Sequence, residues 1–255
     1  SGSLIIIMSA DRPHKCTVKL QWSIMNSVLI TGANRGLGLA LAQQFSACGY
    51  ELYLVVRTES SKIDLLQELP DAKILVCDVT TDKYEALLND WLSDIALDVI
   101  INNAGSGTKA PTLESTKSEF LRKEFETNCI GVLATVKGAL DALKRKHNSL
   151  VINISSRRGS LTMQSELAAK GSGCSYSYRI SKAAQNMLTL CLADDLEDLN
   201  VRVVAIHPGR LLTKMASTDA DMTPKLSAKK LLAMVKSNKL KTRDYISLDT
   251  GELPW

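Results

Sequence analysis

Two residues of this sequence, Tyr178 and Lys182, are of types and at a spacing that suit proton transfer. Four positions apart on a helix, they lie on one face and one turn from each other. A tyrosine with its ordinary pKa of about 10 is a poor base at neutral pH, but a nearby cation favours the phenolate. We therefore expect Tyr178 to exchange protons at a lowered pKa, although a chain with six tyrosines also produces this spacing by chance.

A second chemical feature is the glycine-rich run Thr31–Gly38, which follows an apolar segment and opens a helical pattern. A strand, a glycine turn and a helix form the context of a dinucleotide site, because the helix N-terminus offers free N–H groups and a partial positive charge to pyrophosphate. The alternative is a tight turn whose glycines serve packing alone. The candidate nucleotide-binding residues of the run are Gly32, Asn34, Arg35, Gly36, Leu37 and Gly38.

The elements that must position these residues alternate regularly from Met25 onward, in the pattern of βαβ units. The expected strands are Ser27–Thr31, Glu51–Val56, Lys73–Cys77, Asp98–Asn102, Leu150–Ser155, Val201–His207 and a short one near Tyr245. The expected helices are Gly38–Ala47, Thr80–Ile95, Lys117–Lys146, Ser177–Leu199 and Ser227–Asn238. The strands are almost continuously apolar, which predicts helices on both faces. The sequence thus predicts an α/β fold: a doubly wound parallel (Rossmann) sheet of about seven strands in three α/β/α layers, with ligands at the carboxyl ends of the strands.

Composition narrows the class of protein. Of 255 residues, 45% are hydrophobic and 23% charged, which suits one globular domain over residues 25–255. We expect residues 1–24 to be a leader outside the core, beginning with an expression-tag remnant. A formal charge of +4 without basic runs argues against nucleic-acid binding, and no segment is apolar enough for a bilayer. Six dispersed cysteines without metal-ligand spacing indicate reduced thiols, no metal and a cytoplasmic location.

The end of the second expected strand indicates which nicotinamide coenzyme the site prefers. An NAD-selective site places an acidic residue there, which would repel a 2′-phosphate. Here Val56 is followed by Arg57, and Arg35 of the glycine run can reach the same phosphate. The residues therefore favour NADP(H), the alternative being that Arg57 is a solvated strand-end residue.

Three further segments share an order with the glycine run. They are Asn102–Gly105 after the fourth expected strand, Asn153–Ser156 at the end of the fifth, and Tyr178–Lys182 on the next helix. With Thr31–Gly38 they resemble the short-chain dehydrogenase/reductase (SDR) family over Met25 to Trp255. The Tyr-Arg-x-Ser-Lys-Ala-Ala form and the ending Asp-Thr-Gly-Glu-Leu-Pro-Trp are similar to the C-factor and sniffer-like carbonyl reductases within it.

The resemblance implies roles for individual residues. Those matching the family's catalytic tetrad are Asn128, Ser156, Tyr178 and Lys182. Further matches to cofactor-binding positions are Asp78, Val79, Asn103, Ala104, Gly105, Pro208, Gly209 and Thr213, together with Tyr178 and Lys182. The resemblance also implies that Lys182 holds the nicotinamide ribose and that Asn128 anchors a water. From the residues alone, Asn128 could instead be a capping residue and Ser156 a turn residue.

The function that we expect is an NADP(H)-dependent oxidoreductase interconverting a carbonyl and an alcohol. Hydride leaves NADPH, Tyr178 donates a proton to the oxygen, and Ser156 hydrogen-bonds that oxygen. The alternatives are an NADP(H)-binding regulatory protein with incidental turnover, or dehydration or epimerisation on the same fold. Its partners would be a small carbonyl or alcohol and, by analogy with the family, copies of itself in a homodimer or homotetramer.

Two departures from the family pattern bear on the substrate pocket. The segment Arg157–Ser177 is longer than usual, so we expect it to border the active site. The segment Lys214–Pro224 is short and polar, which predicts an open or small pocket. His207 precedes Pro208 at a strand end, and we expect it to be a hydrogen-bonded structural residue.

Overall fold

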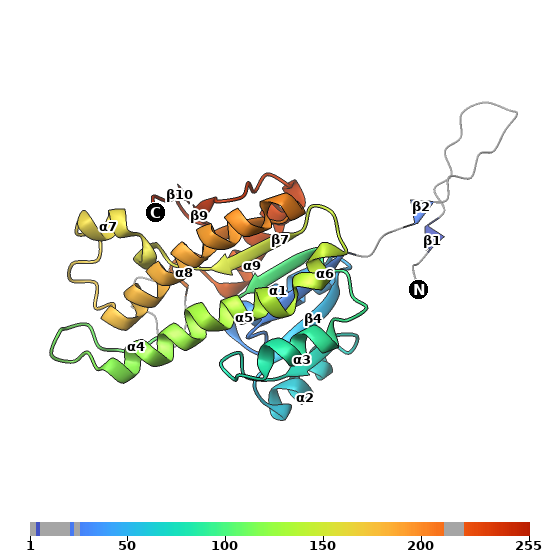
Figure 1. Cartoon of the computed structure of the whole chain (residues 1–255), viewed down its shortest axis with the longest axis horizontal. Coiled ribbons are helices and arrows are strands. Elements are labelled where there is room, and N and C mark those ends of the chain that lie inside the picture. The colour runs from blue at the N-terminus through green and yellow to red at the C-terminus, as the bar shows by residue number, and fades with distance from the viewer. Residues whose placement is uncertain (1–3, 6–20, 23–25, 212–221) are drawn as a thin grey trace, which may run out of the picture.

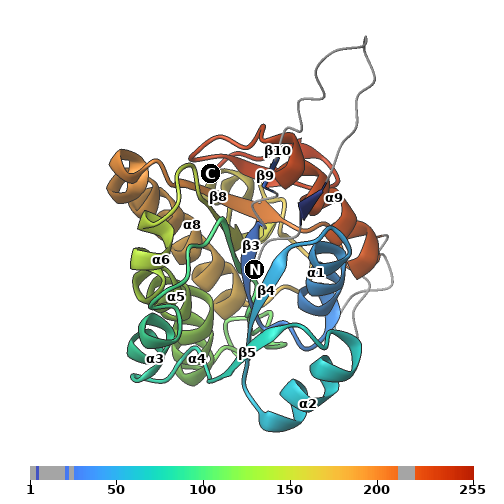
Figure 2. The ribbon, with the colours of Figure 1, turned by 90° about the vertical axis from the view of Figure 1, so that its right-hand side faces the viewer.

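The computed structural model describes residues 4–5, 21–22, 26–211 and 222–255. Within these ranges an eight-stranded sheet has the order β10-β9-β8-β7-β6-β3-β4-β5 (Figures 1 and 2). Its strands are β3 (Ser27–Thr31), β4 (Glu51–Val56), β5 (Lys73–Val76), β6 (Val99–Asn102), β7 (Leu150–Ile154), β8 (Arg202–His207), β9 (Tyr245–Ser247) and β10 (Gly251–Glu252). A separate two-stranded ladder pairs β1 (Leu4–Ile5) with β2 (Gln21–Trp22).

The strand order makes β3 the centre of the sheet, with β4 on one side and β6 on the other. Ile30 lies opposite Leu54 in one parallel pair and opposite Ile101 in the other. Every residue of β3 and β7 is buried, which suits strands covered on both faces. The chain runs from β3 outward to β4 and β5 and then crosses back to β6 on the other side of β3, so the strand order reverses at β3 and creates a switch point at its carboxyl end.

Helices cover both faces of the sheet, as Figure 2 shows. Their bounds are α1 (Gly36–Ala47), α2 (Glu59–Glu68), α3 (Tyr84–Trp91), α4 (Ser118–Phe125), α5 (Gly131–Gly138), α6 (Leu140–Lys144), α7 (Leu161–Ser165), α8 (Tyr176–Leu196) and α9 (Pro224–Ser237). Apolar residues of α1, α2 and α9 form one core cluster with one face of the strands, and those of α3, α5 and α8 form a second with the other face. The three-layer α/β/α prediction is confirmed.

The structure differs from the sequence-based expectation in the middle of the chain. The single helix expected over Lys117–Lys146 is divided into α4, a π-helical turn η1 (Glu126–Ile130), α5 and α6. Close packing accompanies the division, since a Cβ on Gly131 would lie 2.9 Å from a methyl carbon of Val79. The helix α2 was not expected, because its sequence is largely polar and only Leu65 is buried. The antiparallel β10 adds a strand to the seven expected.

The segment between β7 and α8 contains little regular secondary structure, but hydrogen bonds and a ring contact fix its position. It contains the 3-10 turn η2 (Arg157–Gly159) and α7, which Ser160 caps by accepting from the Met163 N–H. The carbonyl oxygen of Trp255 accepts from the Thr162 N–H at 3.1 Å. The Trp255 ring stacks on that of Tyr245, with 4.8 Å between the ring centroids. The last described residues therefore tie this segment to β9.

No helix in the described part of the chain combines the length and apolar character needed to cross a membrane.

Candidate active site

The glycine turn closes tightly at the carboxyl end of β3. Gly32 and Gly36 have φ of +66° and +55°, which side chains disfavour. A Cβ on Gly38 would lie 2.2 Å from the Gly32 carbonyl oxygen, so α1 approaches the turn as closely as a backbone can. Arg35 precedes α1 with extended backbone and makes no side-chain cap. The first N–H groups of α1 thus remain available to an anion.

The Asn102–Gly105 segment supports this turn from the neighbouring strand. The Asn103 side chain donates to the carbonyl oxygens of Thr31 and Gly32 at 3.0 and 3.1 Å. The Thr31 hydroxyl in return accepts from the N–H groups of Asn103 and Ala104. These bonds fix the relative position of two strand ends.

The remaining candidate nucleotide residues lie at the ends of β4, β5 and β8. Arg57 is exposed directly after β4, and Arg35 is exposed in the turn. Asp78 follows β5 and accepts from the Thr80 N–H at 3.0 Å, so it shapes its own loop. At β8, Gly209 has φ of +86°, and the Pro208 carbonyl accepts from Ser227. Thr213 lies outside the described residues.

Ser155 and Ser156 end β7 and point to different partners. Ser155 donates to the Asn186 side chain at 2.5 Å, away from the strand edge. The Ser156 hydroxyl accepts from the Arg158 N–H at 3.2 Å and hydrogen-bonds to Tyr178. Ser156 is therefore the serine of the pair that faces Tyr178, and its role as the reactive serine stays a prediction.

Tyr178 and Lys182 occupy the first turns of α8, where Ser175 caps the helix by accepting from the Tyr178 N–H. The Lys182 ammonium lies 5.9 Å from the centre of the Tyr178 ring. It does not bond the phenol, because it donates instead to the Ile154 carbonyl at 2.7 Å and to Gln185 at 2.9 Å. The side chain thus crosses from α8 to the end of β7.

Burial controls the acidity of both groups. It raises the pKa of Tyr178 to about 12, against the hydrogen bond from Ser156, which lowers it. It lowers the pKa of Lys182 to about 7, against the attraction of Glu124, which raises it. The lowered phenol pKa expected from the Tyr-x-x-x-Lys spacing is therefore not produced by the protein's own groups, because desolvation outweighs them.

Asn128 is fully buried in the π-helical turn and connects two parts of the site. Its amide donates to the Ser106 carbonyl and to the Ser181 hydroxyl, and its oxygen accepts from the Ser106 N–H, all at 2.9 Å. Both N–H donors are thereby used within the protein. The side chain fixes the loop after β6 against α8.

Glu124 was not identified from the sequence. It is fully buried in α4, where one carboxylate oxygen accepts from Thr108 and Ser177 at 2.7 and 2.9 Å and the other has no partner among the described residues. Its negative charge raises the pKa of both Tyr178 and Lys182. The only signal in the sequence was its spacing, four residues before Asn128 and so on the same helix face.

The prediction for His207 was wrong. The side chain ends β8 with 6% exposure, and neither ring nitrogen has a hydrogen-bond partner in the described part of the protein. Burial lowers its pKa to about 4, so the imidazole is neutral. An unpaired buried imidazole is costly unless a ligand completes it.

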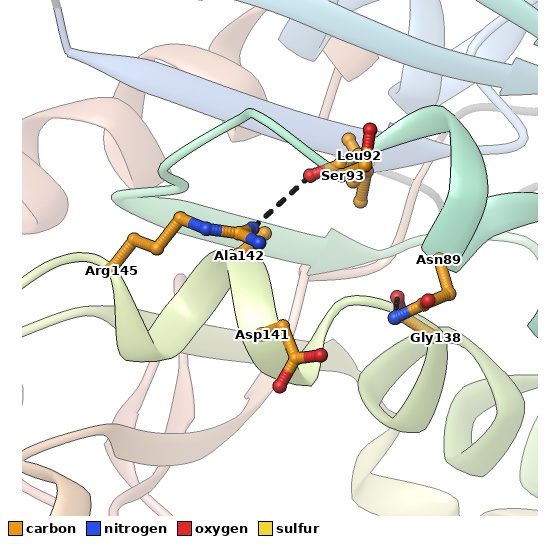
Figure 3. Close-up of a pocket in the computed structure, with 7 residues that line it drawn as sticks. All are labelled: Asn89, Leu92, Ser93, Gly138, Asp141, Ala142 and Arg145. Atoms are coloured by element: carbon orange, nitrogen blue, oxygen red, sulfur yellow. Dashed lines mark hydrogen bonds between the residues drawn. The ribbon is translucent and has the colours of Figure 1, made fainter.

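A small pocket elsewhere on the surface lies between α3 and the α5–α6 junction (Figure 3). Arg145 borders it and donates to the carbonyl oxygens of Leu92 and Ile95 at 3.3 and 3.1 Å. None of the residues that line it follows the carboxyl end of a strand. It is separate from the cluster around Ser156 and Tyr178.

Comparison with known proteins places this arrangement in context. The family model described as short chain dehydrogenase matches residues 26–224. The L-fucose dehydrogenase of Oryctolagus cuniculus is 33% identical over 199 residues, which are 77% of this chain and 66% of that protein. An uncharacterized oxidoreductase of Mycobacterium tuberculosis is 31% identical over 204 residues, 76% of each chain. The chain thus spans about two thirds of the length of several curated relatives.

Two solved structures share the fold closely. An NADPH-bound carbonyl reductase from chicken fatty liver has a TM-score of 0.79 and 28% identity, over 91% of this chain and 99% of that one. The carbonyl reductase Sniffer of D. melanogaster has a TM-score of 0.79 and 29% identity, over 91% and 100%.

Proposed function

We propose that this chain, which belongs to the short-chain dehydrogenase family, is an NADP(H)-dependent oxidoreductase that reduces a carbonyl or oxidises the corresponding alcohol. The family makes it an oxidoreductase; the coenzyme, the reaction and the residue roles are our proposal. One observation carries it: a serine–tyrosine pair, Ser156 and Tyr178, lies beside a buried lysine at the end of the sheet where a nucleotide-type glycine turn also opens.

The glycine turn fits a dinucleotide on structural grounds. A Cβ on Gly32 would lie 3.0 Å from the Ala104 backbone, and one on Gly38 would overlap the Gly32 carbonyl. A twelve-residue helix, α1, begins there without a side-chain cap. A pyrophosphate would accept hydrogen bonds from the free N–H groups of α1, and the positive end of the helix dipole would stabilise its charge.

The coenzyme preference follows from charge at the end of β4. Arg57 is exposed directly after β4, and Arg35 is exposed in the glycine turn after the neighbouring β3. Neither makes an ion pair with a carboxylate in the described ranges. Guanidinium groups bind phosphate oxygens well, whereas an NAD site would present a carboxylate. The NADPH-bound carbonyl reductase of similar fold supports the same assignment.

In reduction, bound NADPH supplies a hydride to the carbonyl carbon. Tyr178 is the proton donor to the oxygen, because its raised pKa keeps the phenol protonated at neutral pH. Ser156 hydrogen-bonds the same oxygen as negative charge develops on it. A protonated phenol suits the reductive direction of the reaction.

Lys182 and Asn128 hold this pair in place. With a pKa near 7, Lys182 exchanges protons readily at neutral pH while it bridges the end of β7 and α8. Asn128 acts as a positioning residue, because its hydrogen bonds go to Ser106 and Ser181. A water anchored by Asn128, as the family resemblance implied, remains a prediction.

The predicted homodimer or homotetramer is also a proposal. Exposed apolar side chains lie on α4 to α5, at Phe125, Ile130 and Leu133, and on α8, at Ile180 and Met187. Several exposed apolar side chains on these helices would suit an interface between copies of the chain.

The direct test is NADPH oxidation with a panel of aldehydes and ketones, followed by absorbance. We expect turnover by the native protein and a kcat lower by about 10³-fold in Tyr178→Phe, in the range typical of a lost general acid. The matched control is Tyr176→Phe, two positions before Tyr178, which should retain activity because the Tyr176 ring contacts Arg179. NADPH binding, measured by fluorescence, should be preserved in both variants.

The outcomes separate the rival functions. Tight NADPH binding without turnover of any carbonyl would favour the regulatory protein. Full activity of Tyr178→Phe would remove the proposed proton donor.

A further inference from the structure

Three arginines border the proposed reactive pair. Arg157 and Arg158 directly follow Ser156 in η2, and Arg179 directly follows Tyr178 in α8. Each is partly buried. None of them belongs to the residues proposed above to bind coenzyme or to transfer a proton.

The Arg158 guanidinium lies close enough to those of Arg157 and Arg179 to be repelled by both. Burial lowers the pKa of Arg158, and the positive charges of Arg157 and Arg179 lower it further, while the Cys174 thiol opposes them. A concentration of like charge in a partly buried place destabilises the fold unless an anion compensates it.

No carboxylate of the described residues pairs with the cluster. Arg158 donates to the Ala168 carbonyl at 2.6 Å, and Arg179 donates to the Gln164 side chain at 3.1 Å. The Arg157 side chain makes no hydrogen bond within the described ranges, whereas its backbone carbonyl accepts from the Ser160 N–H at 3.3 Å. The Arg157 guanidinium contributes to the lowered pKa of the Asp249 carboxyl. The two side chains nevertheless form no ion pair.

His207, at the end of β8, is a buried imidazole that the charges of the same arginines influence. Burial lowers the pKa of this imidazole most, and the charges of Arg157, Arg158 and Lys182 lower it further against Asp249, which raises it, so the field of these cations reaches the end of β8. The ring is nine-tenths buried and both its nitrogens lack partners among the described residues. A neutral imidazole can donate one hydrogen bond and accept another, so it suits a polar ligand held between the cations.

We propose that the substrate carries an anionic group, a carboxylate or a phosphate, which Arg157 and Arg158 bind while Ser156 and Tyr178 hold the carbonyl oxygen. This inference rests on the proposed carbonyl reduction and names its substrate class. Guanidinium groups bind both anions through paired hydrogen bonds. The coenzyme phosphates do not occupy the cluster, because their proposed positions lie at α1 and at the end of β4.

The test compares substrates that differ only in charge, using the full chain and NADPH. The pairs are 4-formylbenzoate with 4-formylbenzamide, 4-oxopentanoate with 4-oxopentanamide, and D-glyceraldehyde 3-phosphate with D-glyceraldehyde. We expect kcat/KM to be at least about tenfold higher for the anion in one or more pairs, mainly through a lower KM. A preference for the anion in the first two pairs would indicate a carboxylate site, and a preference in the third pair would indicate a phosphate site.

The variant that tests the cluster is Arg157→Gln, because this side chain makes no hydrogen bond that the fold would lose. The ratio of kcat/KM between the anion and its neutral partner should fall toward one, and Arg157→Lys should retain most of it. Arg122→Gln, an exposed arginine of α4, is the matched control and should keep the native ratio.

Two results would overturn the inference while leaving carbonyl reduction intact. One is reduction of neutral carbonyls with no preference for any anionic partner. The other is an unchanged ratio in a folded Arg157→Gln protein and also in the Arg158→Gln variant. Absence of turnover with every carbonyl would instead contradict the proposed function, and this inference with it.

Discussion

At the scale of single residues, the site depends on groups whose charge is set by burial. Lys182 is 4% exposed and Glu124 fully buried, so both are removed from the water that would stabilise their charges. The sequence identified Tyr178, Lys182 and Ser156 from their order and spacing, and the structure brings them together. It could not show that desolvation raises the pKa of the Tyr178 phenol, because burial depends on elements far away in the chain.

The pKa of Lys182 predicts how stability depends on pH. The folded protein releases this proton near pH 7, whereas the unfolded chain keeps it to about 10.5, so the unfolded state binds more protons in between. Stability of the coenzyme-free protein should therefore rise with pH above 7, by on the order of 1 kcal/mol per unit. Above pH 10 the raised pKa of Tyr178 acts in the opposite direction, because the unfolded chain ionises its phenol first.

Thermal unfolding between pH 7 and 9.5 would measure this slope. Lys182→Met should flatten it, whereas Lys229→Met, at an exposed position of α9, should leave it as in the native protein. An identical slope in Lys182→Met and the native protein would show that other groups are responsible.

At the scale of elements, the nucleotide turn requires glycine for two different reasons. Gly36 needs it for a positive φ, with no atom near the missing Cβ, whereas Gly38 needs it because the Gly32 carbonyl occupies that space. We expect Gly36→Ala to cost about 1 kcal/mol of unfolding free energy and Gly38→Ala about 3 kcal/mol or more. Urea unfolding measures both. Equal costs would mean that α1 can move away from β3.

The elements differ in how far the sequence predicts them. The buried strands were placed to within one or two residues, because their apolar runs are short and bounded. The division of the helix expected over Lys117–Lys146 was not foreseen, since Asn128 and Gly131 continue a helical pattern and only their contacts with Ser106 and Val79 explain the π-helical turn. The amphipathic signal of α2 is weak, because Leu65 is its only buried side chain.

At the scale of the whole molecule, the residues near Trp255 join three parts of the chain. The Tyr245 hydroxyl donates to the Ser156 carbonyl, the Trp255 ring stacks on Tyr245, and the Trp255 backbone holds Thr162 of α7. This segment therefore connects the sheet edge to the border of the active site. Its role was not evident from the sequence, since it joins positions about ninety residues apart.

We expect Trp255→Ala to loosen the segment between η2 and α8. Trypsin should cleave faster after the exposed Lys170, and KM for the carbonyl should rise several-fold with little change in NADPH affinity. The matched control is Trp255→Phe, which keeps a ring to stack on Tyr245. Cleavage at the native rate in Trp255→Ala would show that the backbone contacts alone hold α7.

The position of β3 between β4 and β6 also matters while the protein is being synthesised. Its second neighbour is made about seventy residues after it, since Thr31 bonds Asn103 across 72 positions. At translation rates of about 5–20 residues per second, that interval lasts roughly 4–14 s. Throughout it, one hydrogen-bonding edge of an apolar strand is open on the ribosome, where nascent chains on neighbouring ribosomes could pair with it. Chaperone binding during those seconds would shield this edge until β6 has been made.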